Sequence, residues 1–309
     1  MKRTILIGAM FLGFIFVANI VFGDFYVIPT RPKIAGTEIT SLPYKISSPG
    51  FYYITRDLTS TGAGIVVEAD NVTIDLMGFS LIGLPGTGKG SSTGNGIFMS
   101  GRANVEVRNG TVRDFGLSGI YEDTVVKGMN HRIISVRSNG NGGAGIYIEG
   151  QNHLIKDCTA SNNGDVGICA EYGSRVTGNT AYKNQHDGVK VCHYCTVTGN
   201  TAYENGGDGI STSYGCTVRG NTASQNQEDG IYVVGNSTVT GNTVYSNTND
   251  GLYVDHNCTV RGNTACYNGN YGIYLGGSCL VHANTATNNT TANIYCLNGN
   301  CHLRDNYAP

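Results

Sequence analysis

The chain has 309 residues, of which 45 are glycine, none is tryptophan and only 14% are charged. The formal net charge is −2 and no basic patch stands out, so nucleic acid is excluded as an expected partner. Abundant glycine, asparagine, threonine and tyrosine with few charges is typical of a chain that turns every few residues, not of a helical enzyme.

The first 23 residues have the features of a secretory signal peptide. Lys2 and Arg3 supply positive charge, the run 5–17 is apolar and short, and Gly23 is a small residue at the expected cleavage point. We therefore expect a mature chain that begins at Asp24, has no membrane span, and is secreted, periplasmic or held at the cell surface. An uncleaved membrane anchor is the alternative, for which the apolar run is short.

Residues 24–62 are expected to form a short N-terminal β cap, because the first strand of a stacked fold otherwise leaves an open edge. Residues 63–309 are expected to form a single β-helix domain. Its period is loose at first, although Gly119-Ile-Tyr and Gly145-Ile-Tyr-Ile already match the first strand of the later repeats.

Between about residues 134 and 300 the sequence repeats with a step of 21 residues. Clear copies of one motif begin at Val197, Val218, Val239 and Val260. Three stretches in each copy, such as 230–233, 238–240 and 243–245, alternate apolar residues with polar or aromatic ones, which predicts strands. One rung cannot bury its own apolar face, so the sequence predicts an all-β fold, a right-handed parallel β-helix of stacked rungs.

Equal positions of successive rungs should lie ~4.8 Å apart, with inward Val, Ile, Ala and Thr forming columns. Two asparagine columns should pass amide hydrogen bonds from rung to rung. The first holds Asn179, Asn200, Asn221, Asn242, Asn263 and Asn284, and the second runs from Asn163 to Asn289. A glycine column runs from Gly167 to Gly272, and Asn293 takes the next position. Because asparagine also tolerates positive φ, we expect a left-handed backbone there.

Cysteine occupies one repeat position in four rungs, and Ser237 fills the same position in a fifth. Small buried core residues are the interpretation we favour for this column. Disulfides between neighbouring rungs, Cys195 to Cys216 and Cys258 to Cys279, are the alternative. For the Cys192-His193-Tyr-Cys195 turn, a local disulfide, two free thiols and a zinc or copper site all stay open.

Two outward columns are candidate functional surfaces. Tyrosines at one strand position form a candidate carbohydrate-binding row, because aromatic rings pack on sugars; self-stacking along the sheet is the alternative. This row holds Tyr232, Tyr253, Tyr274 and Tyr295, and it continues from Cys169, Lys190 and Ser211.

Aspartates that precede the glycine column are candidate Ca²⁺ ligands, because like charges ~5 Å apart repel unless a cation shares them. This column holds Asp187, Asp208, Asp229 and Asp250. Ordinary turn chemistry of Asp before Gly is the alternative there.

The run Tyr182-Lys-Asn-Gln-His186-Asp187-Gly-Val and the next rung, through Asp208-Gly-Ile, resemble rungs of mannuronan (alginate) C5-epimerases. They equally resemble other secreted parallel β-helix repeat proteins and periplasmic copper-site maturation proteins. The resemblance covers about residues 130–306 and implies the fold and an extracytoplasmic location. The Asp-Pro-His-Asp signature of the epimerases is lacking, and His186-Asp187 matches only its last two residues.

Three functions follow as hypotheses. The first is a binding or structural solenoid directed to carbohydrate or the cell surface, without a certain cofactor. The second is a polysaccharide lyase or uronate C5-epimerase, with His186 or Lys190 as acid or base and Asp187 and Asp208 as charge-neutralising groups or Ca²⁺ ligands. The third is periplasmic copper handling through Cys192, His193, Cys195 and His256. The short segment after Asn306 leaves little to cover the last rung, so end-to-end self-association is a further expectation.

Overall fold

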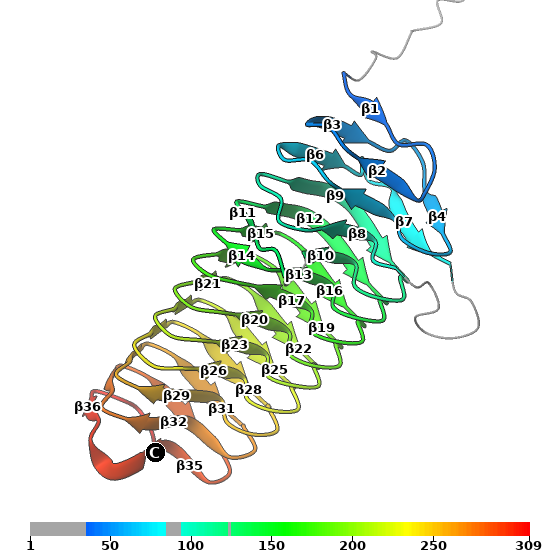
Figure 1. Cartoon of the computed structure of the whole chain (residues 1–309). Coiled ribbons are helices and arrows are strands. Elements are labelled where there is room, and N and C mark those ends of the chain that lie inside the picture. Colours follow the sequence, from blue (N-terminus) through cyan, green and yellow to red (C-terminus); the bar gives the residue numbers. More distant parts are fainter. Residues whose placement is uncertain (1–34, 85–93, 123–124) are drawn as a thin grey trace, which may run out of the picture. The chain divides into compact units, whose positions relative to one another are not determined.

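The computed structural model describes residues 35–84, 94–122 and 125–309. The expected signal peptide lies outside the described residues, as do residues 24–34 of the expected cap. Within the described part the chain winds through successive rungs whose strands pair in parallel with those of the rung before (Figure 1). The predicted fold, a right-handed parallel β-helix with rungs of 21 residues, is confirmed.

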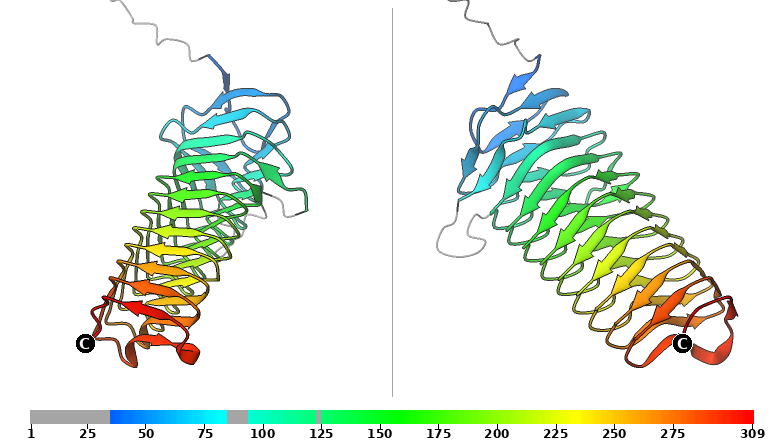
Figure 2. Two further views of the ribbon diagram at one scale, coloured as in Figure 1. Left: turned by 90° about the vertical axis from the view of Figure 1, so that its left-hand side faces the viewer. Right: turned by 180° about the vertical axis from the view of Figure 1, so that it is seen from behind.

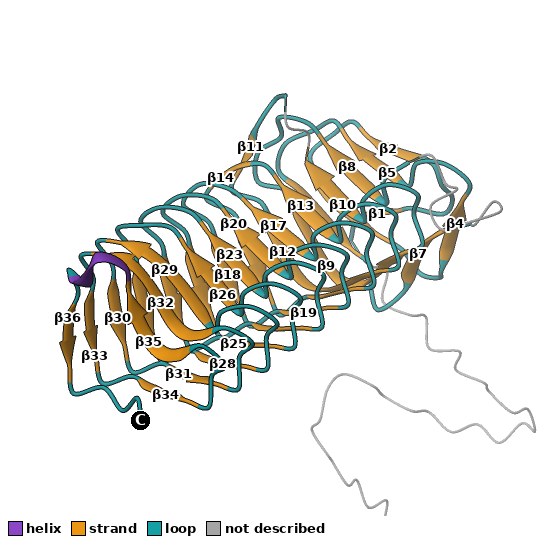
Figure 3. Cartoon of the chain, turned by 90° about the horizontal axis from the view of Figure 1, so that it is seen from below, coloured by secondary structure: helices purple, strands orange, loops and turns teal. Residues whose placement is uncertain are grey.

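One face of the solenoid is a sheet of 12 parallel strands, to which each rung contributes one strand (Figures 2 and 3). Its strands are β2 (Tyr44–Ile46), β5 (Ile65–Val67), β8 (Ile97–Met99), β10 (Ile120–Glu122), β13 (Ile146–Ile148), β17 (Ile168–Ala170), β20 (Val189–Val191), β23 (Ile210–Thr212), β26 (Ile231–Val233), β29 (Leu252–His256), β32 (Tyr271–Gly277) and β35 (Ala292–Cys296). We call it the front sheet.

All but two of the other strands form a 22-stranded sheet, in which the long strands β9 (Glu106–Arg113) and β12 (Arg132–Asn139) join two series. The first series is β1 (Thr37–Glu38), β3 (Gly50–Tyr53), β6 (Val72–Asp75), β15 (Leu154–Lys156), β18 (Arg175–Thr177), β21 (Thr196–Thr198), β24 (Thr217–Arg219), β27 (Thr238–Thr240), β30 (Thr259–Arg261), β33 (Leu280–His282) and β36 (His302–Arg304). The second is β4 (Leu58–Ser60), β7 (Ser80–Gly83), β16 (Thr159–Ser161), β19 (Thr180–Tyr182), β22 (Thr201–Tyr203), β25 (Thr222–Ser224), β28 (Thr243–Tyr245), β31 (Thr264–Cys266) and β34 (Thr285–Thr287).

Two smaller features complete the described part. Strands β11 (Gly128–Met129) and β14 (Gly150–Gln151) pair separately, and Leu297–Gly299 form one 3-10 turn. Strands β1 to β4, which fall within the expected cap, pair in parallel with later strands, so the stacked arrangement extends into that region. The division at residue 62 stays a prediction. No helix among the described residues is both long and apolar enough to cross a membrane.

The core consists of single-residue columns that each rung extends by one side chain. Val176, Val197, Val218 and Val239 are fully buried, for example, and each pairs with its equivalent in the next rung. The expectation of inward threonines is largely wrong: those that flank the buried valines and alanines are half-buried or exposed, because strand alternation turns them outward. The predicted cysteine column is buried as expected. Its four thiols are free, and Cys296–Cys301 form the disulfide.

Both asparagine ladders are confirmed. Each buried amide donates through Nδ2 to the Oδ1 of the next rung, for example at 3.0 Å from Asn205 to Asn226 and from Asn226 to Asn247. The same Oδ1 atom also accepts the backbone N–H of the preceding asparagine, and Nδ2 also reaches a core carbonyl. The irregular last copy keeps the pattern, because Asn284 donates to Asn306 at 2.9 Å. The ladders therefore hold the amides of successive rungs in register.

The predicted left-handed backbone of the glycine column is wrong. Positive φ occurs elsewhere in each rung, at three positions five residues apart such as Tyr194, Gly199 and Glu204. The glycine column is required for space: a Cβ on Gly209 would lie 2.5 Å from the Asn226 amide nitrogen and 2.6 Å from the next backbone carbonyl. Asn293 fits because its own Oδ1 accepts the ladder bond from Asn289, at 3.0 Å.

A single ladder amide should contribute strongly to stability. Asn226→Ala removes the Oδ1 acceptor of the Asn205 backbone N–H and Nδ2, and the Nδ2 donor to Asn247 Oδ1 and the Ala202 carbonyl, all in the core. The free energy of unfolding should therefore fall by about 3 kcal/mol or more. Gln227→Ala removes a neighbouring exposed amide and is the matched control, with an expected change of less than about 0.5 kcal/mol. Urea denaturation of both variants measures the difference. Equal losses would show that the ladder does not carry this stability.

Candidate functional site

The middle residues of the front-sheet strands form a column of side chains on the outer surface. This column is aromatic in most rungs, but three consecutive rungs hold other residues. The strand register places Cys169, Lys190 and Ser211 in consecutive rungs at the interruption. Before it stand Phe98, Tyr121 and Tyr147, and after it stand Tyr232, Tyr253, Tyr274 and Tyr295. Sequence analysis identified only the later tyrosines, although the Gly-Ile-Tyr runs at 119 and 145 carried the signal for two of the earlier ones.

The predicted tyrosine row is a stack of rings. Tyr253 lies between Tyr232 and Tyr274, with ring centroids 4.9 and 4.8 Å away and planes inclined by 16° and 15°. Tyr295 packs on Tyr274 and on Tyr271. The inner rings therefore cover each other and offer only edges and hydroxyl groups to a ligand. On its other side Tyr232 is followed by the small Ser211, so that ring face is not covered by a ring of the same column.

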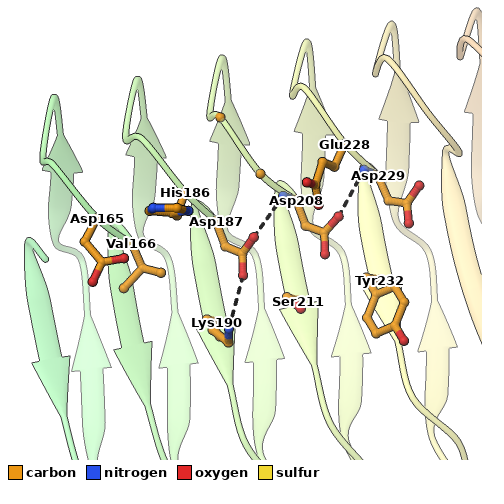
Figure 4. Close-up of a pocket in the computed structure, with 12 residues that line it drawn as sticks. Asp165, Val166, His186, Asp187, Lys190, Asp208, Ser211, Glu228, Asp229 and Tyr232 are labelled. Atoms are coloured by element: carbon orange, nitrogen blue, oxygen red, sulfur yellow. Dashed lines mark hydrogen bonds and ion pairs between the residues drawn. The ribbon is translucent and has the colours of Figure 1, made fainter.

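A groove of about 460 Å³ lies at this interruption (Figure 4). It brings together all four candidate catalytic residues, which are His186, Asp187, Lys190 and Asp208. Its other lining residues are Asp165, Val166, Gly206, Gly207, Ser211, Glu228, Asp229 and Tyr232. Asp250 and the remaining tyrosines of the row lie outside the lining. The groove therefore combines four acid–base candidates with one free aromatic face.

The aspartates of the column are linked from rung to rung by hydrogen bonds. One carboxylate oxygen of Asp187 accepts the backbone N–H of Asp208 at 2.9 Å. In the same way Asp208 accepts the N–H of Asp229, and Asp229 accepts the N–H of Asp250. Asp250 in turn accepts the N–H of Tyr271. These bonds join successive rungs, whereas the alternative weighed against cation binding is a bond within one Asp-Gly turn, so that alternative is not tested. The Ca²⁺ role stays a prediction, and within the described ranges no cluster of three or more His, Cys, Asp or Glu side chains is arranged to hold a metal.

Burial separates the acid–base properties of these carboxyl groups. Asp208 is only 8% exposed, and burial together with the neighbouring charges of Asp187 and Asp229 raises its pKa to about 7. Burial raises the pKa of Asp229 to about 6, with a contribution from Asp250. Asp187 is more exposed and lies 3.8 Å from the Lys190 ammonium group. The groove thus places a carboxyl group that titrates near neutral pH one rung from a lysine and an aspartate.

A second acid cluster lies beside the same interruption and was missed from the sequence. Glu149 and Glu171 follow the paired strands β13 and β17, and the Lys127 ammonium group lies 3.2 and 2.6 Å from their carboxylates. The backbone N–H of Gly150 donates to Glu171 at 3.1 Å. Burial raises the pKa of Glu149, and the hydrogen bond with Glu171 adds to the shift. The two glutamates are 22 residues apart. Extending the alignment of the repeat by one rung toward the N-terminus would have placed them at the same position.

The core itself holds a polar cluster that the sequence analysis did not find. Glu122 and His131 are fully buried, with 3.1 Å between the carboxylate and Nε2, and the His153 ring stacks on His131 at 5.1 Å. Backbone N–H groups donate to both Nδ1 atoms, so the ring protons are on Nε2. Burial lowers the pKa of His153 to about 3, which keeps it neutral. These histidines occupy the position that cysteine and serine hold in later rungs.

The four residues of the copper hypothesis are not assembled into a site. Cys195 is buried, and its thiol donates to the Glu171 carbonyl. The His193 ring packs 5.2 Å from Tyr172 and 5.8 Å from Tyr214. His256 pairs with Asp255 at 2.9 Å. Cys192 and Cys195 are free thiols, which is one of the alternatives left open for this turn.

Two family models match parts of the chain. A model described as a right handed beta helix region matches residues 95–244. A model described as periplasmic copper-binding protein (NosD) matches residues 189–300. No curated protein matches the sequence.

Solved structures resemble the chain more extensively. The A-module of the mannuronan C-5 epimerase AlgE6 of Azotobacter vinelandii matches with a TM-score of 0.67 at 17% identity, over 84% of this chain and 91% of that one. The periplasmic alginate epimerase AlgG matches with a TM-score of 0.65 at 17% identity, over 84% and 75% of the two chains. At this identity the similarity establishes the fold alone.

Asp208 should give the fold a distinctive pH dependence. Because folding raises its pKa, its contribution to stability is complete below the ordinary value of 3.8 and is lost as the pH rises through about 7. Asp208→Asn keeps an oxygen for the Asp229 N–H but cannot titrate. Between about pH 4 and pH 7 the free energy of unfolding of the wild type should fall, relative to this variant, by on the order of 3 kcal/mol. Urea denaturation at both pH values checks this, and a constant difference would contradict it.

Proposed function

We propose that this chain is an extracytoplasmic solenoid that binds carbohydrate in the groove of its front sheet. The observation that carries the proposal is the interruption of the aromatic column, where the free face of Tyr232 borders a groove lined mainly by charged groups together with the Ser211 hydroxyl. An aromatic face packs against the C–H surface of a sugar ring, and carboxylates accept hydrogen bonds from its hydroxyls. Asp187, Asp208 and Lys190 supply such polar partners.

The size of the gap supports this ligand class. Tyr232 and Lys190 are two rungs apart, which separates their backbones by ~10 Å, and the small Ser211 lies between them. A sugar ring bound above Ser211 would pack on Tyr232 in the place where a further aromatic ring is missing from the column. The periplasmic and alginate-directed names of the structural neighbours are consistent with an extracytoplasmic glycan ligand. The predicted roles of Tyr253, Tyr274 and Tyr295 are then limited to their edges and hydroxyls.

Filling the gap should abolish binding without loss of the fold. In the Ser211→Tyr variant the new ring extends the tyrosine stack into the groove, so retention on polysaccharides in affinity gel electrophoresis should disappear while the melting temperature is maintained. Ser224→Tyr is the matched control, because it fills an equivalent gap between Tyr203 and Tyr245 in a row on the other sheet.

A panel of neutral and acidic polysaccharides identifies the ligand with the wild-type chain. If the wild type binds none of them, or if Ser211→Tyr binds as the wild type does, the groove is not a carbohydrate site. Equal loss of binding by Ser224→Tyr would point to a general effect of added tyrosine.

A second candidate function is catalysis on a uronate polymer by a lyase or C5-epimerase. The observation that favours it is Asp208, whose pKa of about 7 is matched to proton transfer at neutral pH and which lines the same groove as His186 and Lys190. In this scheme His186 or Lys190 takes the proton from the carbon next to the sugar carboxylate, and protonated Asp208 donates a hydrogen bond to that carboxylate as negative charge develops on it. The other of the two basic groups, in its protonated form, then returns a proton to the opposite face of the same carbon in an epimerase. In a lyase it instead protonates the departing glycosidic oxygen as that C–O bond breaks.

Catalysis and binding respond differently to one double variant. His186→Ala combined with Asp187→Asn removes one of the two candidate bases and the charge beside Lys190, but retains Tyr232 and an acceptor for the Asp208 N–H. If His186 is the base, any turnover of uronate polymers should fall at least ~100-fold, because general acid–base groups typically contribute that much. Unsaturated-product absorbance and proton NMR of the sugar measure turnover, with and without Ca²⁺. Turnover that survives the substitutions would exclude these two residues.

A further inference from the structure

The last residues of strands β24, β27 and β30 belong to a column that holds several basic side chains. The strand register places Arg219, Thr240 and Arg261 in consecutive rungs. His282 and Arg304 continue the column on β33, which pairs with β30, and on β36, which pairs with β33 (Figure 3). These residues are on the 22-stranded sheet and outside the groove of the front sheet, so the column is a separate surface.

A second groove, of about 520 Å³, runs along this column. Its lining consists of Arg219, Gly220, Thr240, Gly241, Arg261 and Gly262. The three glycines have φ of 63° to 64°, and a Cβ placed on any of them would meet no atom within 4 Å. The floor of the groove is therefore bare backbone that a ligand can approach.

The two arginines have no protein partner for their charge. Neither the Arg219 nor the Arg261 guanidinium makes an ion pair or a hydrogen bond with another residue in the ranges that the structure describes. The two lysines of the regular rungs near residue 190 do have partners: Lys183 pairs with Glu204 and Lys190 with Asp187. The aspartate column follows a different corner of the rungs. The groove of Arg219 and Arg261 is thus a cationic surface within a chain of net negative charge.

We propose that this groove binds a linear acidic polysaccharide through its carboxylate or sulfate groups. Guanidinium groups form paired hydrogen bonds with such oxyanions, and the Thr240 hydroxyl lies between the two arginines as a further donor. Arg219 and Arg261 are two rungs, ~10 Å, apart along the stack. An extended chain with anionic groups on alternate residues of one side can contact both. The inference does not rest on the proposed carbohydrate site of the front sheet.

The test uses the Ser211→Tyr chain, in which the front-sheet groove is filled, so that the second groove alone is measured. Affinity electrophoresis compares dextran sulfate and polygalacturonate with neutral dextran. We expect retention by at least one acidic polymer and none by dextran. Arg219→Gln with Arg261→Gln should weaken it by about 100-fold, at about tenfold for each lost charge-assisted contact.

Two controls make the result specific. Arg175→Gln removes an exposed arginine outside the groove and should leave retention unchanged, and Arg219→Lys with Arg261→Lys should restore only part of it. The proposal is overturned if no acidic polymer is retained, if the double glutamine variant binds normally, or if Arg175→Gln causes the same loss. Equally tight binding of a single-stranded oligonucleotide through the same two arginines would overturn the polysaccharide assignment.

Discussion

The buried asparagine ladders are the constraint on which the rest of this structure depends. The amides in the regular part of each ladder are buried, so their donors and acceptors must be satisfied by the rungs on either side. A rung whose length changed by several residues would move its amide out of line and leave several polar groups unpaired. The step is 21 residues through most of both ladders, and the ladder bond also spans 22-residue steps from Asn141 to Asn163 and from Asn284 to Asn306. Longer steps, of 33 and 26 residues, separate Ile74, Val107 and Ile133, upstream of the first ladder amide at Asn141.

Because the ladders fix the length of the regular rungs, function must arise from side-chain substitutions within columns. The front groove illustrates this. Its walls are the aspartate turns and the Tyr232 ring, and its opening results from Lys190 and Ser211 standing where other rungs have tyrosine. The basic groove has the same origin, since Arg219 and Arg261 replace threonine at one position of the repeat. Both surfaces are local changes on an otherwise uniform solenoid.

The sequence predicted the stack well because its signals are one-dimensional. The step of 21, the ladders, the buried cysteines and the acid and tyrosine columns all follow from strand alternation and register. Failures occurred where one pattern has two physical causes. A run of glycines is compatible with positive φ or with lack of space, and Gly209 shows that space is the cause here. Tyrosines in register are compatible both with a binding platform and with self-stacking. The distances between Tyr232, Tyr253 and Tyr274 show that the rings stack, while the binding role stays a prediction.

Residues outside the regular period were the hardest to predict. Lys127 comes from an irregular rung, and no repeat position indicates that it reaches both Glu149 and Glu171. The buried Glu122 and His131 likewise lie where the step has not yet settled at 21. The candidate catalytic residues, by contrast, were predicted as a group because His186, Asp187, Lys190 and Asp208 belong to regular rungs, where equal positions are neighbours in space.

The stacked backbone also explains why carboxylates of like charge can stand in one column. Each aspartate accepts the N–H of the next, which holds its oxygen in the turn although the neighbouring charge opposes ionisation. The result is a buried carboxyl group, Asp208, whose pKa lies near 7 although no catalytic role need be assumed for it. A shifted pKa in this fold is therefore weak evidence of catalysis by itself. The stronger argument for function is that Asp208 and the free face of Tyr232 line the same groove. The register of the rungs places Asp208 in its column, but it does not require the aromatic column to be interrupted beside it.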